Sequence, residues 1–218
     1  MLSINIPIYN YYVDNLVAQL INQIEKLDVP CEIRLYDDGS SDEFVKHNAT
    51  LANNEYVIFK AMNKNMGRSA IRNKMGQESK YQYLLFIDAD SKLISDSYLQ
   101  NYLDKIDKNT VLCGGTAYSS NPPTDKSKML RWKYGCVREA IAAEQRNSKK
   151  GFIITSNNFL IEKSIFTQTL FREEIQKYGH EDTLLGFDLF KKGVAIKHIN
   201  NAVEHTGLES AEQFIAKT

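Results

Sequence analysis

Short apolar runs alternate with segments of helical periodicity along the first half of the chain. The apolar runs at 2–6, 32–36, 56–60 and 83–87 are typical of buried strands, and Pro7 is expected to end the first of them. Between the first two runs, apolar residues at helical spacing predict a helix: Val13, Leu16, Val17, Leu20, Ile21, Ile24 and Leu27. Residues 68–78 and 97–106 also have a helical pattern, and 110–113 resembles a strand. This β-α-β-α-β-α-β order predicts a largely parallel, doubly wound sheet flanked by helices.

Residues 122–150 have a different composition, because basic residues outnumber acidic ones. The basic residues are Lys126, Lys128, Arg131, Lys133, Arg138, Arg146, Lys149 and Lys150. Leu130, Tyr134, Val137 and Ile141 keep helical spacing, which predicts an amphipathic helix with a basic outer face. Such a face is usually only solvated, but it could also approach phosphates or an anionic membrane surface. A strand at 152–161, then a helix, a loop, a helix and a strand at 195–199 complete the predicted order.

Composition places the chain among ordinary globular proteins and argues against nucleic-acid binding. The 218 residues are 43% hydrophobic and 25% charged, and the pattern contains no internal repeat or low-complexity linker, so we expect a single domain. Lys plus Arg and Asp plus Glu both count 27, so bulk charge favours no nucleic-acid partner. The three cysteines are widely spaced, and neither a signal peptide nor a membrane span is visible. We therefore expect a cytoplasmic protein, with the basic 122–150 segment as a candidate for contact with the inner face of the membrane.

The stretch "YLLFIDADSKL" places Asp88 and Asp90 directly behind the apolar run 83–87. Side chains two residues apart on a strand point to the same face, so both carboxylates should converge beyond the carboxyl end of that strand. Ligands of open α/β sheets bind at this edge. A divalent cation is the usual counter-charge for two neighbouring carboxylates, although a polar turn would contain the same residue types.

Three further polar clusters follow predicted strands, namely "PIYN" at 7–10, "DDGS" at 37–40 and "NMGR" at 65–68. Together with the aspartate pair they would build a binding floor at one sheet edge. Tyr9 could stack on a flat ring, and a carboxylate could accept from a base N–H or a ribose hydroxyl. Gly67 would let the backbone approach a ligand, Arg72 could meet phosphate oxygens, and a metal at Asp90 would complete a nucleoside-diphosphate site.

The ordered set of motifs resembles the family-2 glycosyltransferases with the GT-A fold. The matching motifs are P-x-Y-N, D-D-G-S, N-x-G-x-x-x-x-R-N, D-A-D, N-F-L-I-E-K-S-I-F and G-H-E-D, which together span about residues 2–207. The resemblance implies a nucleotide-binding half at 1–115 and a catalytic and acceptor half at 116–210. The donor-binding residues that we carry over are Pro7, Tyr9, Asn10, Asp38, Gly67, Arg72, Asp88 and Ala89. Among them, Asp88 would face the ribose or a metal-bound water, while Asp90 would ligate Mn²⁺ or Mg²⁺.

The second half of the resemblance concerns the chemistry. Glu181-Asp182 matches the late acidic pair of the family, whose second acid serves as the catalytic base. Asn157, Asn158 and Glu181 would lie toward the donor sugar and the acceptor. His205 would be a metal ligand near the diphosphate, or equally a structural histidine. The expected function is transfer of one sugar from a nucleotide donor, preferably a UDP-sugar, to a hydroxyl of a glycan or lipid-linked acceptor with inversion.

Two departures from the family pattern bear on the acceptor. Glu162-Lys163 stands where the family usually has a basic pair. No Q-x-x-R-W-type motif of the processive synthases follows the acidic pair, which favours the addition of a single sugar over polymerisation.

Alternatives remain open for several residues and for the function. Asp38 and Asp182 could simply cap helices, His180 could orient the acidic pair or only pack, and Tyr9 could be a core residue. A haloacid-dehalogenase-type phosphatase also uses an aspartate pair, but its motif D-x-D-G-T/V differs from the "DADSK" found here. A response-regulator receiver would leave the second half unexplained. A nucleotide-sugar-binding module without catalysis is the non-enzymatic alternative.

The last residues, 211–218, begin a helical pattern that presents Phe214 and Ile215. We expect that this helix is part of a longer element or that it docks on another subunit.

Overall fold

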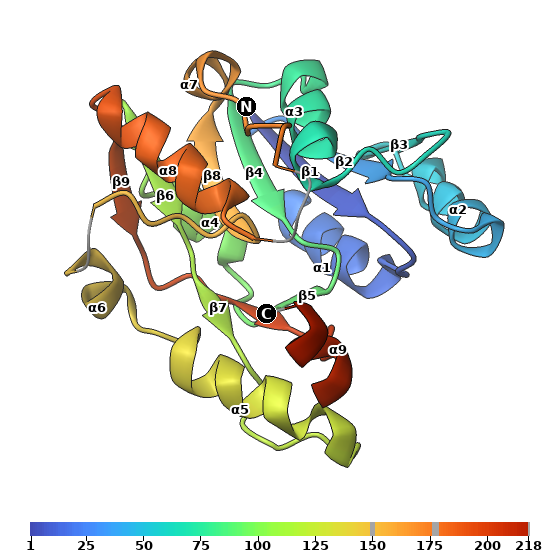
Figure 1. The fold of residues 1–218 in the computed structure, drawn as a ribbon. Coiled ribbons are helices and arrows are strands. Elements are labelled where there is room, and N and C mark those ends of the chain that lie inside the picture. Colours follow the sequence, from blue (N-terminus) through green and yellow to red (C-terminus); the bar gives the residue numbers. More distant parts are fainter. Residues whose placement is uncertain (149–150, 176–178, 218) are drawn as a thin grey trace.

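The computed structural model describes residues 1–148, 151–175 and 179–217. Its main sheet has the strand order β3-β2-β1-β4-β8-β6-β9. The bounds are β1 Leu2–Ile8, β2 Cys31–Asp37, β3 Val57–Ala61, β4 Tyr83–Ile87, β6 Thr110–Cys113, β8 Asn158–Glu162 and β9 Ala195–His198. Only β8 runs antiparallel to its neighbours within this sheet. The predicted doubly wound, mostly parallel α/β fold is therefore observed (Figure 1).

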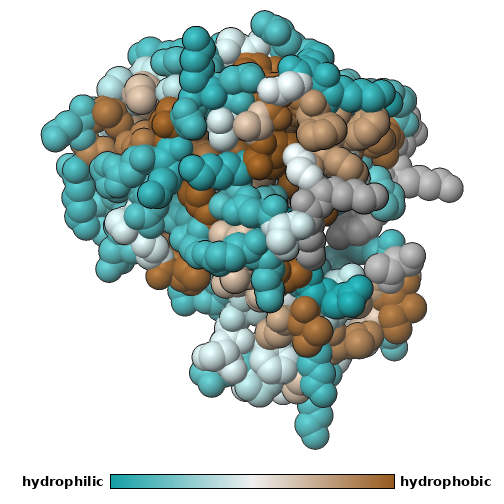
Figure 2. Space-filling view, turned by 90° about the vertical axis from the view of Figure 1, so that its left-hand side faces the viewer, coloured by the Kyte–Doolittle hydropathy of each residue, from teal (hydrophilic) through white to brown (hydrophobic). Residues whose placement is uncertain are grey.

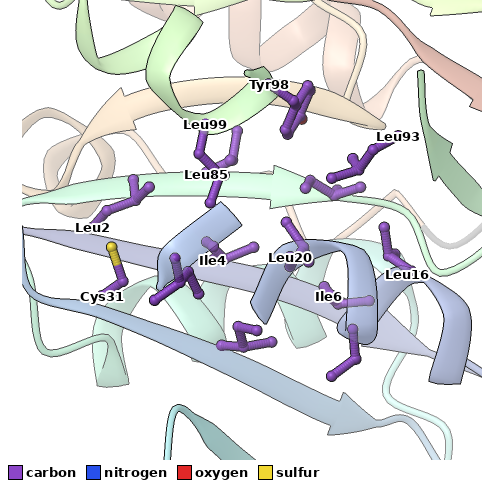
Figure 3. Packing of buried hydrophobic residues seen from close by; sticks show 14 of the residues in the cluster. Leu2, Ile4, Ile6, Leu16, Leu20, Cys31, Leu85, Leu93, Tyr98 and Leu99 are labelled. Atoms are coloured by element: carbon purple, nitrogen blue, oxygen red, sulfur yellow. The ribbon is translucent and has the colours of Figure 1, made fainter. Parts of the chain in front are cut away.

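Helices cover both faces of the sheet. On one face α1 (Asp14–Ile24) and α4 (Tyr98–Leu103) bury their apolar side chains against β1 and β4, as Figure 3 shows for Ile4, Leu20, Leu85 and Leu99. On the other face lie α3 (Arg68–Glu78), α7 (Lys163–Gln168) and α8 (Glu181–Lys191). The remaining helix of the first half, α2 (Asp42–Ala49), leads through the short 3₁₀ helix η1 (Thr50–Asn53) to β3.

Aromatic rings fill the core under α3 and α7. The rings of Phe86 and Phe159 stack with centroids 4.9 Å apart, and Phe166 lies 5.1 Å from Phe86. Gly76 of α3 faces the ring of Phe166 so closely that a Cβ there would collide with it. The absence of a side chain at this position is what lets α3 lie directly over α7.

The first strand is longer than predicted, because β1 continues through Pro7 to Ile8. The backbone groups of odd-numbered β1 residues face β4, as the bond from Tyr83 N–H to the Met1 carbonyl shows. The pairing with β4 ends at Asn5, so the missing N–H of Pro7 leaves no partner unbonded. The expectation that Pro7 ends the strand was wrong for this reason.

The strand predicted at 152–161 is shorter than expected and begins only at Asn158. Asn158 pairs with Ile87, the last residue of β4, and one further bond continues the ladder, from the Asp88 N–H to the Asn157 carbonyl. Residues 152–157 precede the strand and do not belong to it.

A second, three-stranded sheet has the order β5-β10-β7, formed by β5 (Ser91–Leu93), β10 (Val203–His205) and β7 (Thr116–Ala117). It pairs His205 with Ser91, the residue directly after Asp90. Two segments more than a hundred residues apart in sequence thus meet behind the aspartate pair.

The basic segment is not one helix. It forms the 3₁₀ turn η2 (Lys126–Lys128), α5 (Met129–Arg138) and α6 (Ala143–Asn147), while Lys149 and Lys150 lie outside the described residues. No glycine or proline marks the break after Arg138. Glu139 follows α5 as its C-cap residue, and its carboxylate accepts from Arg131 Nη2 and from the Tyr118 hydroxyl.

The C-terminal helix α9 (Ala211–Lys217) packs beside α5, and we call this pair the α5–α9 lobe. The lobe lies below the main sheet in Figure 1, and Figure 2 shows it beneath the body, with hydrophobic groups beside hydrophilic ones. Phe214 contacts α5 through the ring of Tyr134, whereas the side chain of Ile215 is 63% exposed. None of the helices in the described ranges has the length and apolar character needed to span a bilayer.

Candidate active site

A cavity of about 1090 Å³ opens at the carboxyl ends of the parallel strands. Most of the residues that sequence reasoning selected line it, namely Pro7, Tyr9, Asp38, Gly67, Arg72, Asp88, Ala89, Asp90, Asn157, Glu181, Asp182 and His205. Asn10 was also selected but does not line the cavity. Its side chain accepts from Ser41 N–H, and its own N–H donates to Ser40 Oγ, so it ties the loop after β1 to the loop after β2.

Asp38 holds the opposite loop of the cavity floor. Its two carboxylate oxygens accept from the backbone N–H groups of Met66 and Gly67 at 2.7 and 3.0 Å. Gly67 adopts a φ of 89°, which a residue with a side chain rarely tolerates. Burial raises the pKa of Asp38, and the two N–H bonds only partly counteract that rise. Because each oxygen already has one donor, Asp38 can act on a base only through its remaining lone pairs or through the loop that it positions.

Tyr9 stands at the end of β1 and is 56% exposed. It therefore lines the cavity and does not belong to the core. An exposed ring at a sheet edge is a suitable stacking surface for a planar base.

Arg72 is held by one member of the aspartate pair. Its Nη2 lies 2.5 Å from Asp88 Oδ1, its Nη1 donates to the Arg68 carbonyl, and the residue is only 4% exposed. The Asp88 side chain is about one-third exposed to the cavity. The two side chains form an ion pair at the cavity wall, one residue away from the second aspartate of the D-A-D motif.

Asp90 faces a different partner, His205, whose Nδ1 lies 3.3 Å from Asp90 Oδ2. Thr206 donates through both its N–H and its hydroxyl to the Asp90 carbonyl, and Gly207 packs so tightly that a Cβ there would collide with the carboxylate. Burial alone would raise the pKa of Asp90, but the bond and charge of His205 outweigh it and lower that pKa. Conversely, burial lowers the pKa of His205, and Asp90 more than restores it.

The donor set at Asp90 suits a divalent cation that is also bound by a substrate. A carboxylate oxygen and an imidazole nitrogen are ligands that Mn²⁺ accepts. Within the described ranges, no three His, Cys, Asp or Glu side chains group as a metal site. The remaining coordination positions would therefore come from phosphate oxygens and water, as is usual for cations that act on nucleotides.

The acidic pair begins α8, directly after His180, which has a φ of 71° at the N-cap position. Glu181 is 7% exposed and lies 3.7 Å from the Arg68 guanidinium. Asp182 accepts from Thr183 N–H at 2.7 Å. Burial and the charge of Glu181 raise the pKa of Asp182, so this carboxylate is a stronger base than an ordinary aspartate.

Several lining residues were not singled out from the sequence, among them Tyr118, Arg131, Glu139 and Arg146. They come from the irregular region around α5, where the only sequence signal was the basic composition. Arg146 has a structural task, since it donates to the carbonyls of Ile141, Cys113, Gly114 and Ile199.

The two neighbouring asparagines have different surroundings. Asn157 lines the cavity and donates to Thr116 Oγ1. Asn158 is fully buried and accepts from the hydroxyls of Tyr98 and Tyr102. The expectation that Asn158 lies toward the substrates was wrong, because its side chain points into the core, where its amide nitrogen also donates to the carbonyls of Gly115 and Asn201.

Comparison with known proteins identifies the family. The family model described as Glycosyl transferase family 2 matches residues 3–170, most of the chain. The chain belongs to glycosyl transferase family 2. It is 23% identical to the chondroitin synthase of Escherichia coli over 239 aligned positions, which cover 94% of this chain and 34% of that protein.

Solved structures share the fold of this family 2 chain. S. aureus TarS 1–349 in complex with UDP-GlcNAc matches with a TM-score of 0.66 at 18% identity, covering 96% of this chain and 59% of that one. The mannosyltransferase PcManGT from Pyrobaculum calidifontis, in complex with GDP-Man and Mn²⁺, matches with a TM-score of 0.67 at 14% identity, covering 94% and 56%. The expected GT-A fold is thereby confirmed. The chain spans about a third of the curated relative and less than two thirds of these structures.

Proposed function

We propose that the protein is an inverting, metal-dependent glycosyltransferase that moves one sugar from a nucleotide-diphosphate donor to a hydroxyl of a glycan or lipid-linked acceptor. One observation carries the proposal. A carboxylate with a raised pKa, Asp182, lines the same cavity as the Asp90–His205 pair and the Arg72–Asp88 pair. A base for the acceptor and a set of charges for the leaving group therefore share one space.

In this mechanism Asp182 accepts the proton of the acceptor hydroxyl. The hydroxyl oxygen forms a bond to the anomeric carbon while the bond from that carbon to the leaving diphosphate breaks on the opposite face. The raised pKa improves proton acceptance in the transition state. Glu181 contributes charge to this effect and holds Arg68 at the cavity wall.

Asp90 and His205 would hold Mn²⁺ or Mg²⁺ at the diphosphate. When bound, such a cation supplies positive charge next to the leaving group. Arg72, paired with Asp88, lines the same end of the cavity, and its guanidinium is the group that we propose for contact with the phosphate oxygens. Nucleotide sugars occupy some of the related structures, which supports a donor of this class for the present chain.

Uridine is the base that we propose. Tyr9 supplies an exposed ring for stacking, and the remaining lone pairs of Asp38, which the N–H groups of Met66 and Gly67 hold in place, supply an acceptor for a pyrimidine imide N–H. We further propose that residues 1–115 bind the nucleotide and residues 116–210 serve catalysis and the acceptor.

The geometry disfavours the phosphatase alternative. A phosphatase of the haloacid-dehalogenase type needs a free aspartate as the nucleophile and a second aspartate as the acid. Here Asp88 is bound by Arg72 at 2.5 Å and Asp90 faces His205 at 3.3 Å. Neither carboxylate is poised for attack on phosphate.

A donor screen tests the proposed reaction. Release of nucleoside diphosphate should be measured across UDP-, GDP- and dTDP-sugars, with mixed glycan and lipid-linked acceptors and with Mn²⁺. We expect release to be highest from a UDP-sugar and to depend on the acceptor. Tighter binding of GDP than of UDP would contradict the uridine assignment, and hydrolysis of a phosphomonoester would favour the phosphatase.

We also propose that the α5–α9 lobe contacts an anionic membrane surface. Leu130, Tyr134 and Val137, spaced along one face of α5, are 42%, 42% and 73% exposed. Lys126, Lys133 and Arg138 are exposed around them, and the stretch 126–138 contains no acidic residue. Apolar side chains among cations are the pattern of a helix that lies in a lipid interface.

Co-sedimentation with vesicles tests this surface. The protein should sediment with phosphatidylserine-containing vesicles more than with pure phosphatidylcholine vesicles, and Val137→Asp should reduce that fraction. Phe190→Asp, a matched change at an exposed apolar residue of α8, should not. Equal sedimentation of the two variants, or no preference for anionic vesicles, would contradict membrane contact through α5.

A further inference from the structure

A continuous series of contacts connects the C-terminal helix to the proposed metal site. The ring of Phe214 on α9 lies 5.2 Å from the guanidinium carbon of Arg131 on α5. The same guanidinium carbon lies 5.4 Å from the centroid of the Tyr118 ring. The ring of Tyr118 meets the ring of His205 edge-on, with centroids 5.7 Å apart, and His205 contacts Asp90. Each contact is short enough for packing or cation–π attraction.

The middle of this series is firmly held. Glu139 accepts from both Arg131 Nη2, at 3.1 Å, and the Tyr118 hydroxyl. Gly135 brings the backbone of α5 against the Tyr118 ring, and a Cβ there would collide with it. The Arg131 side chain is only 12% exposed. Tyr118 therefore has little freedom to rotate while α5 and α9 stay in place.

His205, at the end of this series of contacts, needs a neighbouring group that fixes the orientation of its ring. His205 is the last residue of the three-residue strand β10, and its ring contacts only Asp90 and Tyr118 among the ring and ion-pair contacts of the described residues. A ligating imidazole requires one ring orientation, which is normally set by a group outside the metal's own ligands. Without Tyr118 behind it, the ring could turn its nitrogen away from the cation.

We infer that Tyr118 is a positioning residue for His205 and that α9 supports it through Phe214 and Arg131, so that the affinity for the divalent cation depends on the C-terminal helix. This inference rests on the proposed function, because it assumes a cation at Asp90 and His205. It assigns a role to three residues that have no place in the transfer chemistry itself.

The test is the affinity for Mn²⁺, titrated in the presence of saturating UDP, for the whole chain and for Phe214→Ala. Phe214 does not line the cavity, so any effect on the cation must be indirect. Loss of a group that orients a metal ligand typically costs about 10- to 100-fold in affinity, and we expect about 10-fold here. Phe190→Ala, which removes an exposed aromatic ring from α8, is the matched control and should keep the wild-type affinity.

A double-mutant cycle separates support of His205 from a general loss of structure. In the His205→Ala background, Phe214→Ala should have no further effect on Mn²⁺ affinity, because the residue that it supports is already gone. Metal-free UDP affinity should change less than two-fold in all four proteins.

The results that would overturn this inference differ from those that would overturn the proposed function. Unchanged Mn²⁺ affinity in Phe214→Ala, an equal loss in both backgrounds, or a parallel loss of metal-free UDP affinity would overturn the support by α9. Absence of UDP-linked Mn²⁺ binding in the wild-type protein would instead overturn the metal dependence in the proposed function, and this inference with it.

Discussion

Asp90 and Asp182 line the same cavity, but their surroundings shift their pKa values in opposite directions. The bond and charge of His205 lower the pKa of Asp90 despite burial, whereas burial and the charge of Glu181 raise that of Asp182. One carboxylate is thus kept ionised, and the other is prepared to take a proton. Divergent pKa values of two acids in one site are a common sign of divided catalytic roles.

Asp182→Asn should lower turnover strongly and leave donor binding intact. Removal of a general base typically costs about 10² to 10⁴-fold in rate. The nucleotide floor is built by residues of the first half, so UDP and metal affinity should stay near the wild-type values. Asp182 lies in the first turn of α8 after the N-cap residue His180, and the side-chain oxygen of Asn can still accept from Thr183 N–H, which keeps the loss of stability small. Near-normal transfer by this variant would move the base role to Glu181 or His180, or indicate a retaining mechanism.

The pH dependence of transfer should reflect the raised pKa of Asp182. A general base works in its deprotonated form, so the rate falls as the pH falls through that pKa. Because burial and Glu181 raise it, the acidic limb of the profile should lie above the ordinary aspartate value of about 3.9. The profile should be measured as kcat/KM against pH. An acidic limb that persists unchanged in the residual activity of Asp182→Asn would assign it to another group.

At the scale of elements, hydrophobic periodicity predicted the bounds of an element correctly where a single pattern runs through the whole element. Helix α3 and strands β4 and β6 have the predicted bounds. The apolar residues of α3 face one core, and those of the two strands are buried in the cores on both faces of the sheet. The same reasoning failed at 122–150, where α5 ends after Arg138, and at 152–157, where residues predicted as strand lie outside β8. The bond between Tyr118 and Glu139 at the end of α5 joins residues 21 positions apart. Contacts of this range leave no local pattern.

Gly76→Ala should destabilise the packing of α3 on α7 without affecting the site. The added Cβ would collide with the ring of Phe166, which is fully buried and has no room to move. Overpacking costs about 1–3 kcal/mol, and the gain in helix propensity, at most about 1 kcal/mol, offsets only part of it. Urea unfolding should therefore show a lower midpoint with unchanged UDP affinity. A midpoint equal to that of the wild-type protein would contradict the tight contact between α3 and α7.

At the scale of the whole molecule, the site depends on segments that the fold brings together. The strand-end clusters could be predicted as neighbours, because parallel strands end at one edge of the sheet. The meeting of His205 with Asp90 could be expected only from the family resemblance, since it depends on the pairing of β10 with β5 in the second sheet, which no local pattern signals. The wall formed by Tyr118 and Arg131 escaped prediction, because contacts between the α5–α9 lobe and the loop after β7 set it. The cavity residues at the strand ends can therefore be predicted from the order of the elements. The cavity residues near the α5–α9 lobe can be found only from the tertiary structure.

Isothermal titration of the whole chain with UDP, with and without Mn²⁺, tests the central claim most directly, with Asp90→Ala as the matched variant. The proposed site predicts saturable UDP binding that Mn²⁺ strengthens in the wild-type protein. It also predicts that Asp90→Ala loses this strengthening while it keeps the fold, because Asp90 lies at a strand end that faces the cavity. Absence of UDP binding, or Mn²⁺-linked UDP affinity that is equal in Asp90→Ala and the wild-type protein, would contradict the assignment of this cavity as a metal-dependent nucleotide-sugar site.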